Sequence, residues 1–246
     1  MRRVSQTTSS RHSAPLRFAV FGVRLSRLSP DFTASWIPWT GERYVTENLS
    51  SKLDASCTPD STLLSDFRRL WAEGEDLWSR HQDAPAFHGY VSADYLAVYE
   101  SLARLRGSVL SVLEWGSGLG IVTIMASRMG FEAYGIEAEP RLVMHAEDLA
   151  RTYGPDAQFA QGSFVPDDFA WDPADGSDVY RTVIDAPSAY DELDIKLTDF
   201  DLVYAYPWPD EHILYHNIMR NFGRKGAMLL TYDAREGMEL VRFHRD

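Results

Sequence analysis

The chain has 246 residues, of which 45% are apolar and 13% aromatic, enough to bury one sizeable hydrophobic core in one main domain. Its single cysteine, Cys57, excludes an internal disulfide and cannot supply a zinc cluster, and we expect no metal. The net charge of −12 disfavours a nucleic-acid partner, because that affinity rests on clustered Lys and Arg. No apolar run reaches the ~20 residues of a membrane helix, so we expect a soluble, cytoplasmic protein.

The charge is unevenly distributed along the chain. Residues 1–30 hold six arginines, several serines and no acidic residue, so the remainder carries −18 (−12 − 6). Such a start resembles an organelle transit segment, but a disordered tail or a start codon placed too early is the interpretation that we favour. It lacks the apolar stretch and the cleavage site of a secretory signal.

Residues 31–106 are expected to form a helical N-terminal extension or cap. From about Pro59, apolar residues recur at three- and four-residue spacing, which predicts an amphipathic helix. A second helix is predicted to begin after Ser92, as its N-cap, and to end at Gly107.

Residues 107–246 alternate between strand and helix patterns. This order predicts an α/β fold with a doubly wound, mostly parallel sheet and flanking helices. The acidic, turn-rich segment 172–201 is interpreted as a surface crossover. Strands are predicted over 109–115, 132–138, 157–161, 201–206 and 227–233, and helices over 121–129 and 141–154.

The run "EWGSGLG" follows the first predicted strand of this domain. Gly116, Gly118 and Gly120 allow a sharp turn and a close approach of the backbone to a ligand, and the next helix presents free N–H groups. Glu137 ends the second strand, 17 residues after Gly120, where a carboxylate can accept both hydroxyls of a ribose. The pattern therefore predicts a nucleoside ligand.

"VLEWGSGLG" followed by "GIEAEP" resembles the first two motifs of the class I (seven-strand, Rossmann-like) S-adenosylmethionine-dependent methyltransferases, and the resemblance spans roughly residues 85–233. It implies S-adenosylmethionine as cofactor, with the ribose held by Glu137. The loop and the acid that opens it would surround the amino-acid part of the cofactor. These residues are Glu114, Gly116, Ser117, Gly118 and Gly120.

Two further segments carry the resemblance with departures. "FHGYV" resembles a segment of lysine methyltransferases in which a tyrosine closes over the methionine end of the cofactor, which here is Tyr90; a buried aromatic is the alternative. In "QGSFVPDD", Ser163 stands where the family often has an acid that contacts the adenine, with Phe164 packing nearby. Alternatively, Ser163 only caps a turn.

The run "YAYPWP" at the end of the strand over 201–206 would lie beside the transferred methyl group. Tyr206, Trp208 and Asp210 are expected to form the wall of an acceptor site, which could attract an ammonium or methylated amine. Ala205 and Tyr206 replace the Asx acceptor of amino-methylating DNA enzymes, so that function becomes a minor alternative. Trp208 could instead pack under the next helix, and Asp210 could simply open it.

The C-terminus departs from the family. Only 13 residues follow Asp233, too few for the usual helix and two further strands, although "MELVRFHR" can supply one. We therefore expect truncated C-terminal strands, or an edge completed by a partner such as a second copy in a homo-oligomer. His212 and His216 have a metal-like spacing, but a solvated helix face is the preferred interpretation.

Three functional hypotheses remain open. The first is a methyltransferase that acts on a small molecule or a protein side chain. The second is a catalytically silent, nucleoside-binding domain with an assembly or regulatory role. The third, an NAD-dependent oxidoreductase, is disfavoured because no Tyr-x-x-x-Lys pair lies near the expected site.

Overall fold

A computed structural model describes residues 45–48 (backbone only), 60–170, 181–184 and 186–243 of the chain. The predicted tail over 1–30 and Cys57 lie outside these residues. Within them, no helix is both long and apolar enough to cross a membrane.

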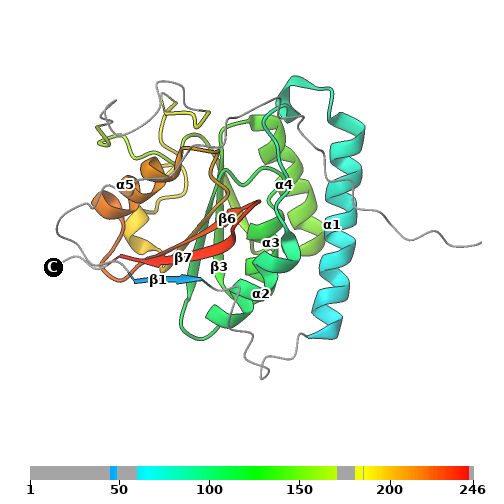
Figure 1. Ribbon diagram of the computed structural model, residues 1–246. Coiled ribbons are helices and arrows are strands. Elements are labelled where there is room, and N and C mark those ends of the chain that lie inside the picture. Colours follow the sequence, from blue (N-terminus) through cyan, green and yellow to red (C-terminus); the bar gives the residue numbers. More distant parts are fainter. Residues whose placement is uncertain (1–44, 49–59, 171–180, 185, 244–246) are drawn as a thin grey trace, which may run out of the picture. The chain divides into compact units, whose positions relative to one another are not determined.

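One seven-stranded sheet organises the described chain (Figure 1). Strands over the predicted ranges are confirmed within two residues at each end. The strands are β1 (Val45–Asn48), β2 (Ser111–Trp115), β3 (Glu132–Glu137), β4 (Gln158–Gln161), β5 (Leu202–Ala205), β6 (Met228–Asp233) and β7 (Gly237–Arg242).

The strand order is β1-β7-β6-β5-β2-β3-β4. The five strands from β6 to β4 pair in parallel, and β7 runs antiparallel to both of its neighbours. The chain builds β3 and β4 on one side of β2 and then returns to place β5 on the other side. The topological switch point therefore lies between β2 and β5, where ligands of such sheets bind beyond the carboxyl ends of the strands.

Helices cover both faces of the sheet, with α1 to α4 on one side and α5 on the other (Figure 1). Helix α1 packs on α3 and α4, and α2 packs on α3 and β7, so the N-terminal helices share the core of the sheet. The helices are α1 (Ser61–His81), α2 (Tyr95–Leu105), α3 (Ile121–Arg128), α4 (Pro140–Tyr153) and α5 (His212–Phe222), with short 3-10 turns η2 (Pro85–Phe87) and η4 (Leu197–Asp199).

The start of α2 differs from the prediction. Asp94, not Ser92, is its N-cap, because the Asp94 carboxylate accepts hydrogen bonds from the N–H groups of Leu96 and Ala97 at 3.1 Å each. An ionised carboxylate also favours the positive end of the helix dipole. The helix ends at Leu105, and Gly107 follows with φ of +84°.

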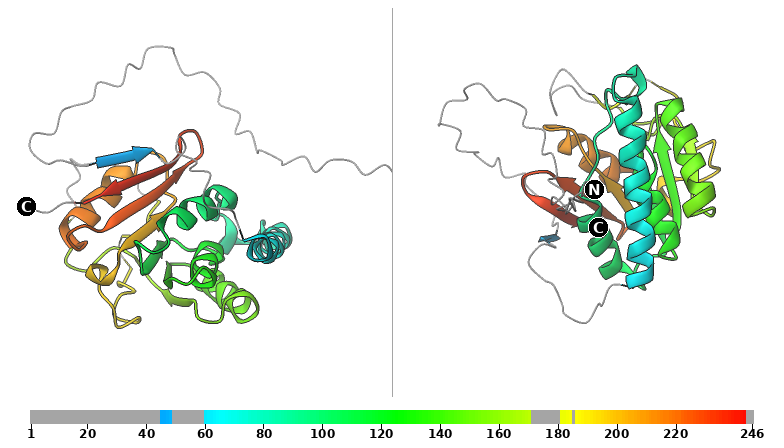
Figure 2. Two further views of the ribbon diagram at one scale, coloured as in Figure 1. Left: turned by 90° about the horizontal axis from the view of Figure 1, so that it is seen from below. Right: turned by 90° about the vertical axis from the view of Figure 1, so that its right-hand side faces the viewer.

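Within the described residues one strand, β7, follows β6, as predicted from "MELVRFHR", and the sheet still has seven strands. A tight turn connects β6 to β7, and the Asp233 carboxylate accepts from the N–H groups of Arg235 and Glu236 within it. Figure 2 shows β1, from the N-terminal segment, beside β7 at the sheet edge. The position that the short C-terminus cannot fill is thus occupied by a strand that precedes the core in sequence.

Candidate functional site

The glycine loop lies between β2 and α3, next to the switch point. Gly116, Gly118 and Gly120 have φ values of +68°, +54° and +70°, a left-handed conformation that other residues adopt only with strain. Gly120 is also the N-cap of α3 and lacks a side chain to pair with the first N–H groups of the helix. Most N–H groups of the loop are bonded within the protein: Ser117 donates to the carbonyl of Ile136 and Gly120 to the carbonyl of Ser117, and Thr123 in the first turn of α3 donates to Glu114.

Two of these glycines are packed tightly. A Cβ at Gly118 would lie 2.7 Å from the ring of Tyr90, and a Cβ at Gly120 would lie 2.6 Å from the ring of Phe159. At Gly116, which is exposed, a Cβ would meet nothing within 4 Å. Gly116 is therefore the point where the loop faces open space.

Glu137 fastens this loop to the end of β3. Its Oε2 accepts a hydrogen bond from the N–H of Gly118 at 2.8 Å, and its Oε1 accepts from the N–H of Glu139 at 2.9 Å. Burial raises the pKa of Glu137, and these backbone donors partly offset the increase. A carboxylate oxygen has a second lone pair, so the two oxygens can still accept two hydroxyls of a ligand.

Glu114 is buried below the loop on β2. Its Oε2 accepts from the backbone N–H of Thr123 at 2.8 Å and from the Thr123 hydroxyl at 2.6 Å. Burial raises the pKa of Glu114 to about 8, although the bonds from Thr123 act in the opposite direction. The free protein thus holds a neutral acid next to the loop near neutral pH.

Ser117 adds an unsatisfied hydroxyl to the same loop. Its side chain is buried, and within the described part of the chain its Oγ has no hydrogen-bond partner. Buried hydroxyls are rarely left unpaired, and a ligand that supplies the partner is one explanation of this exception.

Tyr90 covers the glycine loop from the segment before α2. Its ring lies against Gly118, and its hydroxyl forms a 2.8 Å hydrogen bond with the hydroxyl of Tyr95. Burial raises the pKa of Tyr90. The structure therefore places Tyr90 on the loop, and its action on a cofactor stays a prediction.

Ser163 follows β4, and its hydroxyl is engaged within the protein. It donates to the carbonyl of Val183 at 2.6 Å and accepts from the N–H of Val165 at 3.0 Å. Phe164 stacks on Trp115, with ring centroids 4.8 Å apart. Ser163 thus caps a turn, and its contact with a nucleobase stays a prediction.

The three predicted acceptor-wall residues have different surroundings. Tyr206 makes an edge contact with Tyr232, with centroids 4.9 Å apart. The face of Trp208 carries the guanidinium of Arg181, 4.5 Å from the ring centroid. Asp210 is exposed with φ of +71°. Of the three, Tyr206 contacts another tyrosine at a strand end, Tyr232.

Glu211 and Tyr204 are buried polar residues near the site that sequence reasoning missed. Glu211 accepts from the Thr182 hydroxyl at 2.6 Å and from the N–H of Arg181, and it thereby ties the crossover to α5. The hydroxyl of Tyr204 has no partner within the described residues. Neither feature has a local signal, because each depends on segments that meet only in the fold.

The interpretation of His216 as part of a solvated helix face is wrong. Its ring packs against Phe243, and burial lowers its pKa to about 4. Among the described residues, no group of three or more metal-ligating side chains occurs.

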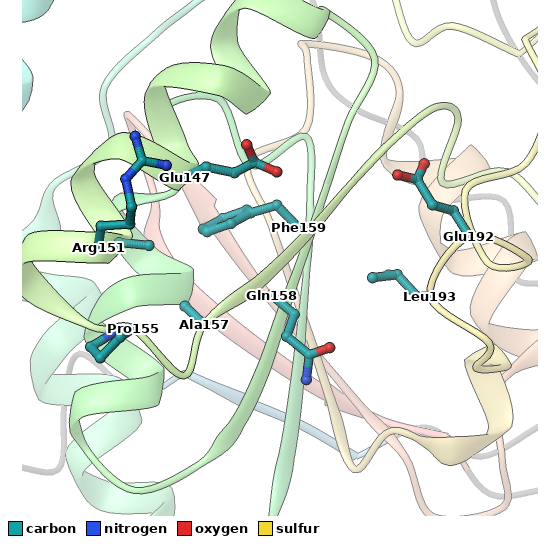
Figure 3. Close-up of a pocket in the computed structure, with 9 residues that line it drawn as sticks. Glu147, Arg151, Pro155, Ala157, Gln158, Phe159, Glu192 and Leu193 are labelled. Atoms are coloured by element: carbon teal, nitrogen blue, oxygen red, sulfur yellow. The ribbon is translucent and has the colours of Figure 1, made fainter.

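A separate pocket of about 420 Å³ lies at the outer edge of the sheet, between α4, β4 and the loop before η4 (Figure 3). Glu147, Arg151 and Glu192 supply its charged groups. None of the predicted site residues lines it.

No protein-family model matches the sequence, and no curated protein matches it significantly. The structure is similar to many solved proteins at low identity, among them the following three. An RNA methyltransferase from Salinibacter ruber in complex with S-adenosyl-L-homocysteine is 16% identical, covers 64% of this chain and 95% of that one, and has a TM-score of 0.44. A methyltransferase from Geobacter sulfurreducens is 14% identical, with coverages of 77% and 94% and a TM-score of 0.44. Cofactor-bound Rv0187 from MTB is 15% identical, with coverages of 79% and 95% and a TM-score of 0.45.

The fold itself is defined by the arrangement of the strands. Seven strands, a switch point between β2 and β5, and a glycine loop directly after β2 make up a doubly wound, Rossmann-like α/β fold.

Proposed function

We propose that the protein is an S-adenosylmethionine-dependent methyltransferase that acts on a small molecule or a protein side chain. The observation that carries the proposal is the Glu137 carboxylate, which holds the N–H of Gly118 while each of its oxygens retains acceptor capacity. A ribose diol and the adjoining amino-acid group fit that combination of a carboxylate acceptor and a loop that is exposed at Gly116.

Several residues would hold the cofactor. Glu137 would accept the ribose hydroxyls, and the loop around Gly116 would pass along the amino-acid part. Glu114 and the Ser117 hydroxyl, which has no partner among the described residues, offer further polar contacts. When bound, the sulfonium of S-adenosylmethionine supplies an activated methyl group.

The protein's contribution to catalysis would be mainly positioning and exclusion of water. Tyr90 covers the loop, and Tyr206 lies at the exit of β5 beside it. Because the sulfonium loses its charge during transfer, aligning the two reactants in a partly dry site can provide much of the rate enhancement.

A catalytically silent domain is the second candidate, and one contact favours it. The ring of Tyr90 lies so close to Gly118 that a ligand at that point would have to displace it. Such a domain would keep the fold for assembly or regulation.

An assay with methyl-labelled S-adenosylmethionine separates the two candidates. Label would be followed into panels of amine and hydroxyl acceptors, and ultraviolet cross-linking would report cofactor binding separately. Transfer at limiting cofactor that Glu137→Ala lowers, and that Glu132→Ala at the exposed opposite end of β3 leaves unchanged, supports the enzyme. Cross-linking without transfer to any acceptor supports the silent domain, and absence of both would contradict the proposal.

A further inference from the structure

Tyr204 has a buried hydroxyl without a partner at the centre of the sheet. The residue is 2% exposed, and within the described chain no hydrogen bond reaches its hydroxyl. Its neighbour in register on β2 is Glu114, so the two side chains lie on the same face of adjacent parallel strands. The hydroxyl is therefore next to the acid that opens the glycine loop.

Two half-exposed tyrosines extend this position toward solvent. The hydroxyl of Tyr204 interacts electrostatically with Tyr206 and Tyr232, whose rings meet edge to face. We call Tyr204, Tyr206 and Tyr232 the tyrosine cluster. It lies at the carboxyl ends of β5 and β6, on the same side of the switch point as Tyr90.

Carboxylates border the tyrosine cluster on two sides. Asp94, at the start of α2, interacts with Tyr204 and Tyr232, and Asp233, at the end of β6, interacts with Tyr206 and Tyr232. Burial alone would raise the pKa of Asp233, but the N–H groups of Arg235 and Glu236 outweigh it and hold the pKa below its ordinary value. Asp233 is therefore ionised near neutral pH.

Aromatic faces, neighbouring carboxylates and one buried acceptor hydroxyl are complementary to a single kind of group. An organic ammonium is attracted to aromatic faces, is neutralised by carboxylates and can donate an N–H to a buried oxygen. The Trp208 face does not compete for this role, because the guanidinium of Arg181 already covers it.

We propose that the tyrosine cluster, with Asp94 and Asp233, binds the ammonium group of the methyl acceptor. This assignment rests on the proposed function, and it narrows the acceptor to an amine. The buried Tyr204 hydroxyl would receive an ammonium N–H, and the two aspartates would set the preference for positive charge.

Binding of two probes tests the assignment without turnover. Benzyltrimethylammonium carries a fixed charge and has no N–H, whereas phenethylamine is protonated and has N–H donors. Each would be titrated by calorimetry into the full chain with S-adenosylhomocysteine present and absent, with phenethyl alcohol as the neutral control. N-acetyl-lysine methylamide in a parallel arm distinguishes a lysine side chain from a free amine as the source of the ammonium.

The variants are chosen to preserve the fold. Asn can replace Asp94 at a helix N-cap and Asp233 in its turn, so the pair Asp94→Asn and Asp233→Asn removes charge with little loss of local hydrogen bonding. Tyr204→Phe removes only the hydroxyl, which has no hydrogen-bond partner among the described residues. Asp148→Asn, in an exposed ion pair with Arg151 on α4, is the matched control.

The assignment predicts that both ammonium probes bind and the alcohol does not. The double Asn variant should bind both about tenfold more weakly, and Asp148→Asn should bind them as the original chain does. Tyr204→Phe should weaken the binding of phenethylamine, which has N–H donors, and leave the binding of benzyltrimethylammonium unchanged. Equal binding of amine and alcohol, or equal effects of the control variant, would overturn the assignment while S-adenosylhomocysteine binding remains. Loss of S-adenosylhomocysteine binding in the unsubstituted chain would instead contradict the proposed function.

Discussion

The carboxylate of Glu137 lies 2.8 Å from the backbone nitrogen of Gly118 and joins the end of β3 to the glycine loop of β2. One side chain thus fixes the loop and retains acceptor capacity for a ligand. Since the same carboxylate also accepts from the N–H of Glu139 before α4, it connects three segments of the site.

Replacing Glu137 should loosen the loop even without a ligand. Glu137→Gln presents an amide NH2 group to one of the two backbone donors, so one hydrogen bond is lost. The free energy of unfolding should fall by about 1–3 kcal/mol, the usual effect of leaving a buried partner unsatisfied. Urea unfolding checks this, with Glu132→Gln on the same strand as control. Equal stability of the two variants would show that the Glu137 carboxylate does not stabilise the loop.

Gly118→Ala should be more damaging than the same change at Gly107. Both glycines have positive φ, +54° and +84°, so both variants acquire backbone strain of about 1–2 kcal/mol. Only at Gly118 would the new Cβ meet an anchored ring, Tyr90, at 2.7 Å, whereas nothing lies within 4 Å at Gly107. Thermal unfolding of the two variants isolates the cost of the clash. In a double-mutant cycle, Gly118→Ala should cost less in a Tyr90→Ala background than in the unsubstituted chain. An equal loss at both glycines would show that Tyr90 does not press on the loop.

The strands and the glycine loop could be predicted from sequence because their signals are local. Apolar runs such as Val112 and Leu113 are typical of strands buried on both faces, and alternating glycines need no distant contact to be recognised. The edge strand β1 could not, because it is four residues long and depends on pairing with a segment almost 200 residues later. The N-cap at Asp94 was missed for a local reason, since Ser92 also fits the capping preference.

Cofactor binding should release a proton from Glu114. In the free protein, burial holds its pKa at about 8, so the group is protonated near neutral pH. A bound cationic amino group would favour the carboxylate and lower that pKa, so the affinity for S-adenosylhomocysteine should increase as the pH rises toward about 8. Calorimetry in buffers of different ionisation enthalpy measures the proton directly. Glu114→Gln should release no proton on binding. A binding enthalpy that does not depend on the buffer in the unsubstituted chain would contradict proton release from Glu114.

His216 should make the protein less stable in mild acid. Its pKa falls from 6.5 to about 4 in the fold because burial against Phe243 disfavours the charged ring. The unfolded chain therefore binds more protons in that window, and stability is lost as the pH falls from 6.5 toward 4. The loss should be on the order of 2–3 kcal/mol. Denaturant titrations should show that the stability of His216→Phe depends less on pH across this range. An unchanged pH dependence would contradict the burial of a neutral His216.

Among the site residues, as in the fold, those with local sequence signals could be predicted and those that depend on distant contacts could not. Glu114, Glu137 and the glycines were predicted because they follow strands at fixed spacing. The partners of Trp208 and Ser163 were not, because Arg181 and Val183 reach them across the crossover. The hydroxyl of Tyr204 is distinguished only by the absence of a partner within the described chain, which no sequence pattern reports.

Calorimetric titration of the full chain with S-adenosylhomocysteine, and separately with NAD, distinguishes a methyltransferase from a nicotinamide-binding protein. We expect S-adenosylhomocysteine to bind with one site per chain, Glu137→Ala to weaken this binding by about 1–3 kcal/mol, and NAD to give no heat of binding. Binding of NAD alone, or binding of S-adenosylhomocysteine that Glu137→Ala leaves unchanged, would contradict this expectation.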